Sequence, residues 1–150
     1  MLFDKKIILL DYEITSRENA LTTLSDSLYA ADQVTSEFKN SILSRESNFP
    51  TGLQTKTIGV AIPHTNADKV ISEQMGFLRL KDPVIFNQMG DNKKINVKLI
   101  FMLALKNPDK QLHMLQTLMQ LFQNKDSIDQ ILKVDTTDEF VRVMNNFGIN

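Results

Sequence analysis

The chain has 150 residues, of which 42% are apolar, and this is enough for one domain with a substantial core. Its charge is nearly balanced, with 17 Lys and Arg against 18 Asp and Glu, and the absence of a basic block argues against a nucleic-acid partner. There is no cysteine, which excludes disulfides, thiol catalysis and cysteine-bound zinc, and which is compatible with a reducing cytosol.

The N-terminal part of the sequence predicts a strand followed by a helix. The run IILL at residues 7–10 predicts a strand that is buried on both faces. It is too short for the apolar region of a signal peptide, and no other run approaches the length of a membrane span, so we expect a soluble protein. Thr15 and Glu18 have the spacing of a capping box and predict a helix over residues 16–30.

The middle of the chain predicts one more helix and then several strands. A helix over residues 36–47 should end before Pro50, because the residue that precedes a proline avoids the helical region. The segment PTGLQTK at residues 50–56 has the composition of a turn. Extended segments are then expected at residues 58–62, 75–80, 84–86 and 97–105. The last of these is an almost continuous apolar run, which is typical of a strand covered on both faces.

The C-terminal third is predicted to be helical. Asn107, Pro108 and Asp109 are suited to open a helix. That helix should bury one face, formed by Leu112, Leu115, Leu118, Met119 and Phe122. Two shorter helices are expected at residues 127–132 and 136–146. Because strands alternate with helices, we predict a single domain over residues 1–150 with a three-layer α/β/α fold, in which helices flank a mixed central sheet.

His64 is the first candidate for a functional residue. It follows Pro63, which marks the end of a strand because proline cannot donate to a sheet ladder. Ligand sites in open α/β sheets favour this location. A neutral imidazole is a nucleophile that can accept a phosphoryl group and release it again. The alternative interpretation is a surface histidine in a loop.

Two further side chains are weaker candidates. Arg45 comes late in a helix, and its guanidinium could bind phosphate oxygens, although a solvated helix charge is the simpler interpretation. His113 lies off the apolar face of its helix and is expected to be partly exposed. A metal-dependent hydrolase using His64 and His113 remains an alternative, but no carboxylates can be assigned as further ligands, and we predict no metal site and no cofactor.

The segment SRESNFPTGLQTKTIGVAIPH, residues 44–64, resembles the active-site region of a known family. This family comprises the fructose/mannitol-type enzyme IIA domains of the bacterial phosphoenolpyruvate:sugar phosphotransferase system (PTS). The matching positions are Arg45, Glu46, Thr51, Gly52, Gly59, Ala61, Pro63 and His64. The resemblance extends through VIFNQMG and residues 97–118 and covers most of the chain. The Pro-His-Thr ending and the segment NPDKQL are most similar to the galactitol-type branch.

The resemblance implies a phosphocarrier with the mannitol/fructose enzyme IIA fold, located in the cytoplasm. His64 would accept a phosphoryl group from the phosphohistidine of HPr on Nε2. It would pass the group to a cysteine of the cognate enzyme IIB, which acts with the membrane enzyme IIC in the uptake of galactitol or a related sugar or polyol. Arg45 would stabilise the phosphoryl group. From their positions next to these residues in the sequence, we expect Thr51 to orient the arginine loop and Thr65 to donate a hydrogen bond to the phosphate.

One position departs from the family pattern. Many members carry a second active-site histidine where this chain has Gln111. His113 is displaced from that position by roughly 200° around the helix, so the role is not transferred to it. Gln111 could still donate an uncharged hydrogen bond in the phosphate pocket. The resemblance also leaves a second function open, in which phosphorylation of a nitrogen-type regulatory EIIA controls a partner protein.

Overall fold

A five-stranded mixed sheet forms the middle of the structure, a computed structural model that describes residues 1–150. The strand order is β1-β4-β5-β3-β2, with β1 parallel to β4 and β3 parallel to β5, and the other neighbours antiparallel. The strands are β1 (Ile8–Tyr12), β2 (Gly52–Gln54), β3 (Gly59–Ala61), β4 (Gln74–Asn87) and β5 (Lys94–Ala104). The helices are α1 (Arg17–Ala30), α2 (Phe38–Asn48), α3 (Pro108–Phe122), α4 (Lys125–Lys133) and α5 (Thr137–Asn146), with a short 3-10 helix η1 (Ala67–Lys69).

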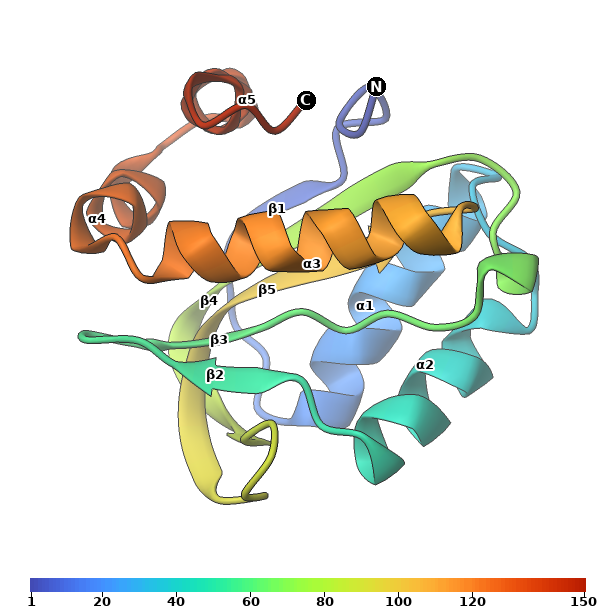
Figure 1. The fold of residues 1–150 in the computed structure, drawn as a ribbon, viewed down its shortest axis with the longest axis horizontal. Coiled ribbons are helices and arrows are strands. Elements are labelled where there is room, and N and C mark those ends of the chain that lie inside the picture. Colours follow the sequence, from blue (N-terminus) through green and yellow to red (C-terminus); the bar gives the residue numbers. More distant parts are fainter.

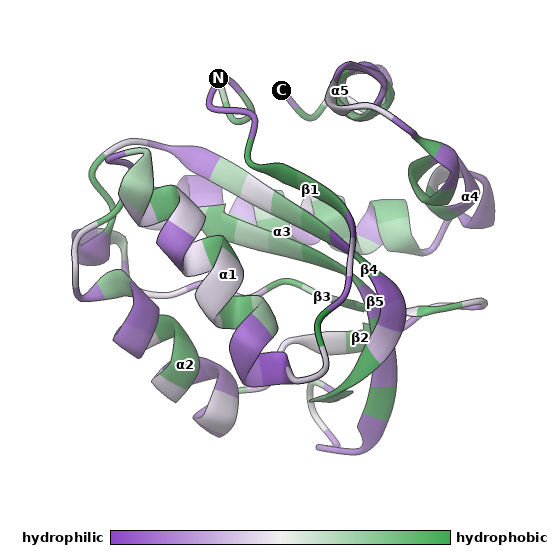
Figure 2. Ribbon diagram, turned by 180° about the vertical axis from the view of Figure 1, so that it is seen from behind, coloured by the Kyte–Doolittle hydropathy of each residue, from purple (hydrophilic) through white to green (hydrophobic).

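Helices cover both faces of this sheet, as predicted (Figures 1 and 2). Helices α1 and α2 lie on one face, and α3, α4 and α5 lie on the other. The sheet separates two apolar clusters of 19 and 18 buried residues. Successive residues of β5 alternate between them: Phe101 belongs to the first cluster, and its neighbours Ile100 and Met102 belong to the second. The prediction that this strand is covered on both faces is therefore confirmed.

Residues 7–10 are covered on both faces, as predicted, although β1 is an edge strand: residues 7 and 9 pack against one apolar cluster, and residues 8 and 10 pack against the other. The strands differ from the prediction at two places. The predicted segments 75–80 and 84–86 belong to one strand, β4. Its register against β5 is irregular between Arg79 and Val84, around Pro83, which has no N–H to donate to the ladder. The predicted turn at 50–56 contains the short strand β2.

The helices are found where they are expected, with corrections at the cap of α1 and on the apolar face of α3. Ser16 caps α1 by accepting a hydrogen bond from the Asn19 N–H, so Thr15 is not the N-cap. In α3, Leu112 and Met119 are exposed. They lie about 100–120° around the helix from the buried Leu118, outside the stripe that faces the sheet. The sequence pattern assigns Leu112 and Met119 to the apolar face because the apolar residues alone do not show where the centre of the buried face of α3 lies. The residues that do face the core are Met114, Leu115, Leu118, Leu121 and Phe122.

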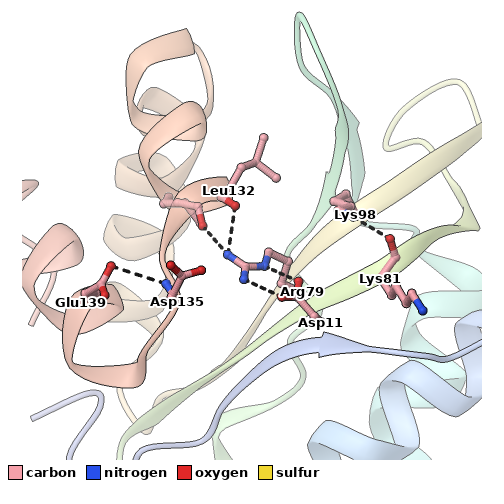
Figure 3. Close-up of polar contacts among 8 residues, drawn as sticks. Asp11, Arg79, Lys81, Lys98, Leu132, Asp135 and Glu139 are labelled. Atoms are coloured by element: carbon pink, nitrogen blue, oxygen red, sulfur yellow. Dashed lines mark hydrogen bonds and ion pairs between the residues drawn. The ribbon is translucent and has the colours of Figure 1, made fainter.

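A buried arginine connects the sheet to the C-terminal helices (Figure 3). Arg79 on β4 forms two hydrogen bonds of 2.8 and 3.0 Å to the carboxylate of Asp11 on β1. Its Nη1 donates to the carbonyls of Ile131 and Leu132, each at 3.1 Å. These carbonyls belong to the last turn of α4, where no helical N–H remains to bind them. Arg79 therefore caps α4 and fixes it to the β1–β4 edge of the sheet.

None of the helices is long and apolar enough to cross a membrane.

Candidate functional site

His64 lies just beyond the C-terminal end of β3, where the sequence predicts it. The chain continues beside β5 for two residues after β3 ends, and the Pro63 carbonyl accepts a 3.0 Å hydrogen bond from the Leu103 N–H. Gly52 and Gly59 allow this part of the sheet to pack closely. A Cβ at Gly52 would lie 2.6 Å from the Asn87 carbonyl oxygen, and one at Gly59 would collide with the backbone of β5. The two motif glycines therefore keep β2 and β3 in contact with their neighbours.

The histidine ring is held in one orientation by its own loop. The Nδ1 atom lies 2.8 Å from the carbonyl oxygen of Ile62. A carbonyl oxygen only accepts hydrogen bonds, so Nδ1 must carry the proton. The lone pair of the neutral ring is therefore on Nε2. This arrangement leaves Nε2 as the nucleophilic atom.

The surroundings of His64 favour its neutral form. Burial lowers the pKa of the imidazole, the hydrogen bond to Ile62 opposes this effect, and the charge of Arg45 lowers the pKa further. The Arg45 guanidinium reaches Asn66, two residues after His64. At neutral pH the ring is therefore unprotonated and available to attack an electrophile.

Arg45 lies in the last turn of α2 and keeps most of its hydrogen-bonding capacity free. Its only side-chain hydrogen bond is a long one, 3.5 Å from Nη1 to Oδ1 of Asn66. The guanidinium carbon lies 5.6 Å from the centre of the exposed Phe49 ring, within the range of a cation–π contact. No carboxylate forms an ion pair with it. Arg45 can therefore donate to an anion without first breaking a strong contact.

Glu46, the neighbour of Arg45, points the other way and is buried. Oε2 accepts a 2.8 Å hydrogen bond from the Thr51 N–H, and Oε1 accepts another of 2.8 Å from the Thr51 hydroxyl. Burial raises the pKa of Glu46, while the two hydrogen bonds from Thr51 and the charge of Arg17 act in the opposite direction. Sequence reasoning includes Glu46 in the motif but gives it no role. The signal is its spacing of four residues from Ile42, which places a carboxylate on the buried face of α2.

The two threonines of the motif are also engaged in buried contacts. Thr51 donates its hydroxyl to Glu46 and accepts a 3.2 Å hydrogen bond from the Ile62 N–H. It contacts the residue next to Arg45 and makes no hydrogen bond to Arg45 itself. Thr65 is buried, and its hydroxyl forms a short hydrogen bond with the Ser41 hydroxyl on α2. Both threonines thus join α2 to the segment that carries His64.

Gln111 and His113 lie in different surroundings on α3. Gln111 is half-buried in the first turn, and its Oε1 is buried with no hydrogen-bond donor. His113 is exposed and lines an open cavity of about 450 Å³ together with Met1, Glu73 and Met114. No group of three or more His, Cys, Asp or Glu side chains is arranged to hold a metal ion. The metal-dependent alternative gains no support from this geometry.

The comparison with protein families agrees with the fold. The family described as "Phosphoenolpyruvate-dependent sugar phosphotransferase system, EIIA 2" matches residues 1–147. The chain belongs to this family. It is an EIIA component of the PTS, and thus a phosphotransferase component.

Three similar proteins show which kinds of enzyme IIA the chain resembles. The galactitol-specific EIIA component of Escherichia coli K12 is 29% identical over 121 residues, which cover 81% of each chain. A structure of the complex of mannitol enzyme IIA with phosphorylated enzyme IIB from E. coli gives a TM-score of 0.79 at 19% identity, covering 97% of this chain and 98% of that chain. The nitrogen regulatory protein IIA-Ntr from Neisseria meningitidis gives a TM-score of 0.75 at 25% identity, covering 93% and 94%. These likenesses confirm the predicted fold class.

Proposed function

We propose that the chain is a phosphocarrier that accepts a phosphoryl group on Nε2 of His64 and passes it to a second protein. The observation that carries the proposal is the hydrogen bond between Nδ1 and the Ile62 carbonyl, which leaves the Nε2 lone pair free on a neutral ring. The site lies at the end of a strand, where His64 is half-buried. The proposed location of the protein is the cytoplasm.

The chemistry needs only an exchange of P–N and P–S bonds. The Nε2 lone pair attacks the phosphorus of a phosphohistidine donor, and the P–N bond of the donor breaks with its electron pair returning to the donor imidazole. In the second step a cysteine thiolate of the acceptor attacks the phosphorus. The bond to Nε2 then breaks, and its electron pair remains on His64. The proton stays on Nδ1, hydrogen-bonded to the Ile62 carbonyl, throughout, so no external base is required.

Arg45 is proposed to bind the phosphoryl oxygens during both steps. Its guanidinium reaches Asn66, two residues after His64, and has free donors. In the transition state the charge spreads over the phosphoryl oxygens. Gln111 is proposed to donate through its amide to the same group, replacing the second histidine of related proteins. Thr51 and Thr65 are proposed to form the wall of the phosphate pocket through their buried contacts with α2.

The proposed donor is HPr, and the proposed acceptor is a cysteine of an enzyme IIB that acts with a membrane enzyme IIC. Support for enzyme IIB comes from the mannitol enzyme IIA–IIB complex, in which the similar chain occurs with its phosphorylated partner. The absence of cysteine from this chain agrees with a thiol step on the partner. The galactitol-specific relative supports uptake of galactitol or a related sugar or polyol.

A regulatory EIIA is the second candidate function. The observation that favours it is the similarity to the nitrogen regulatory protein from N. meningitidis. In that case His64 would be phosphorylated in the same way, but the state of the histidine would control the binding of a partner protein. Rapid phosphoryl transfer to an enzyme IIB distinguishes the two functions, because only the carrier requires it.

The proposal is tested by incubating the purified protein with phosphoenolpyruvate, enzyme I and HPr, and measuring its intact mass. We expect one acid-labile phosphoryl group on the wild type and none on His64→Ala, with unchanged circular dichroism. Addition of the galactitol enzyme IIB should then remove the label. A folded wild-type protein that stays unlabelled beside active HPr would contradict the carrier function.

A further inference from the structure

We propose that Glu46, acting through Thr51, is a positioning residue that fixes the ring tautomer of His64, so that only Nε2 is available as the nucleophile. The inference deepens the function proposed above and rests on it for its catalytic consequence. Its structural part, the control of the tautomer, can be measured without any phosphoryl donor.

The first step of the connection lies between α2 and the turn that precedes β2. The Glu46 carboxylate accepts both the N–H and the hydroxyl hydrogen of Thr51. A carboxylate has no hydrogen to give, so it forces the Thr51 hydroxyl to act as donor towards it. The lone pairs of the Thr51 oxygen are then left for another donor.

The second step links Thr51 to the segment that carries His64. The backbone pairing of β2 with β3 ends at Gly52 and Ala61. One residue further on, the Ile62 N–H donates to the Thr51 side-chain oxygen at 3.2 Å and so extends the ladder by a side-chain contact. On the other side, the Pro63 carbonyl is bound by the Leu103 N–H of β5. Residues 62 and 63 are therefore held from both neighbouring strands.

The third step reaches the imidazole. With its N–H fixed, Ile62 presents its carbonyl to Nδ1 of His64. The tautomer of a neutral histidine is set by the hydrogen bond that one ring nitrogen makes. If Ile62 turns away, Nδ1 loses its acceptor, the proton can move to Nε2, and Nε2 then has no lone pair for attack.

The choice of a carboxylate for this position supports a positioning role. Glu46 continues the buried face of α2 formed by Phe38 and Ile42, where an apolar side chain would pack without desolvating a charge. The cost of that burial is visible in the raised pKa of Glu46. An apolar residue, however, would leave the hydroxyl of Thr51 free to donate elsewhere. The carboxylate therefore orients a hydroxyl, which packing alone does not achieve.

The test compares four variants of the full chain by long-range ¹H–¹⁵N NMR of the His64 ring in the unphosphorylated protein. Thr51→Val removes the acceptor for the Ile62 N–H and keeps the branched shape of the side chain. Glu46→Gln keeps the volume and removes one acceptor oxygen. Thr51→Ser restores the hydroxyl and serves as the rescue variant. Glu13→Gln is the matched control, because Glu13 is exposed and pairs only with Lys81.

We expect the Nδ1–H tautomer alone in the wild type, Thr51→Ser and Glu13→Gln, and a population of Nε2–H in Thr51→Val and Glu46→Gln. Acceptance of phosphoryl groups from HPr should slow on the order of 10- to 100-fold in the last two, as for other losses of an orienting contact. If Thr51→Val fails to fold, Glu46→Gln decides the question alone.

Folded variants that keep the pure Nδ1–H tautomer would overturn the inference. If Thr51→Val and Glu46→Gln show the Nε2–H tautomer but HPr does not phosphorylate the wild type, the positioning role is supported and the carrier function is contradicted. Failure of the positioning role can therefore be distinguished from failure of the carrier function.

Discussion

Two arginines in this fold have opposite relations to their surroundings. Arg79 is 4% exposed, and all three of its guanidinium nitrogens donate hydrogen bonds. Nε and Nη2 donate to the Asp11 carboxylate, and Nη1 donates to two carbonyls of α4. Arg45 is partly buried, and it has one long hydrogen bond to Asn66 and a contact with the Phe49 ring. The first side chain joins three elements of the structure, and the second is free to bind something that is not part of it.

The difference shows why burial of charge alone does not identify a functional residue. A guanidinium can hold a fold together when protein acceptors bind its donors, as at the α4 terminus (Figure 3). The same group next to a nucleophile, with donors free, is suited to bind a transferred anion. The two roles differ in whether protein acceptors already bind the hydrogen-bond donors of the guanidinium. The first two predictions below each change one of the two arginines and measure both stability and phosphoryl transfer.

Replacement of Arg45 should have the largest effect on transfer. We expect Arg45→Ala to slow phosphoryl transfer from HPr by a factor on the order of 10², the cost of losing one preorganised donor to a developing charge. The free energy of unfolding should change by less than about 0.5 kcal/mol, because the side chain makes few contacts. Stopped-flow or quenched-flow transfer and urea denaturation measure the two quantities.

Two controls sharpen that result. Lys39→Ala removes another exposed charge from α2, one that is paired with Asp26, and should leave transfer unchanged. Arg45→Lys keeps the charge and loses the planar fork, so an intermediate rate would show that geometry contributes. Wild-type kinetics in Arg45→Ala would remove this residue from the mechanism.

Replacement of Arg79 should produce the reverse pattern. Arg79→Met keeps an apolar stem of similar length but leaves two carbonyls of α4 without donors, so we expect a loss of about 2–3 kcal/mol in the free energy of unfolding. The loss is limited because Asp11 is 59% exposed and can be hydrated again. Transfer by the folded fraction should remain near wild type. Denaturation with urea measures the loss, and the neighbouring, exposed Lys81→Met is the control. A stable variant with impaired transfer would show that the two sites are coupled.

The contrast between the arginines also shows what the sequence can predict. Apolar periodicity identifies the layers, because β5 alternates between two cores in every residue from Leu99 to Ala104. The position of His64 follows from Pro63, which ends the strand locally. The contacts of Arg79 with Asp11 and with Leu132 join positions far apart in the chain, and no local pattern encodes them.

The corrections have the same physical origin. The four apolar residues at 7–10 correctly predict a segment covered on both faces, but they do not show that β1 lies at the sheet edge. Pro83 interrupts the pattern of β4 without ending the strand. Glu46 could have been suspected from its spacing to Ile42, but its two hydrogen bonds depend on the return of the chain at Thr51. Sequence therefore predicts the parts of the site that a single element carries, and fails where two elements must meet.

The pH dependence of transfer gives a smaller effect that again separates the arginines. Burial lowers the pKa of His64, so the neutral nucleophile should persist below pH ~6.5, where a free imidazole becomes protonated. The neutral ring stabilises the fold fully above that pH, and this contribution is lost as the pH falls through the lowered pKa. Arg45→Gln should raise the pKa of His64, because the arginine charge disfavours a second positive charge. Arg79→Met should not change it. An NMR titration of the His64 ring measures its pKa in the wild type, Arg45→Gln and Arg79→Met. A wild-type pKa above ~6.5 would contradict the role of burial.

The smallest effect is expected on replacement of His113. Comparison with Gln111 tests which side chain of α3 acts at the site. His113→Ala should leave phosphoryl transfer unchanged, because the ring is exposed in a cavity with Met1 and Glu73. Gln111→Ala, two positions earlier on the same helix, should slow transfer measurably, since the half-buried amide is proposed to reach the phosphoryl group. The two variants remove side chains of similar size from one helix, so a general effect on α3 would appear in both. A large loss of transfer in His113→Ala alone would show that His113, and not Gln111, acts at the site, and the assignment along α3 would then be wrong.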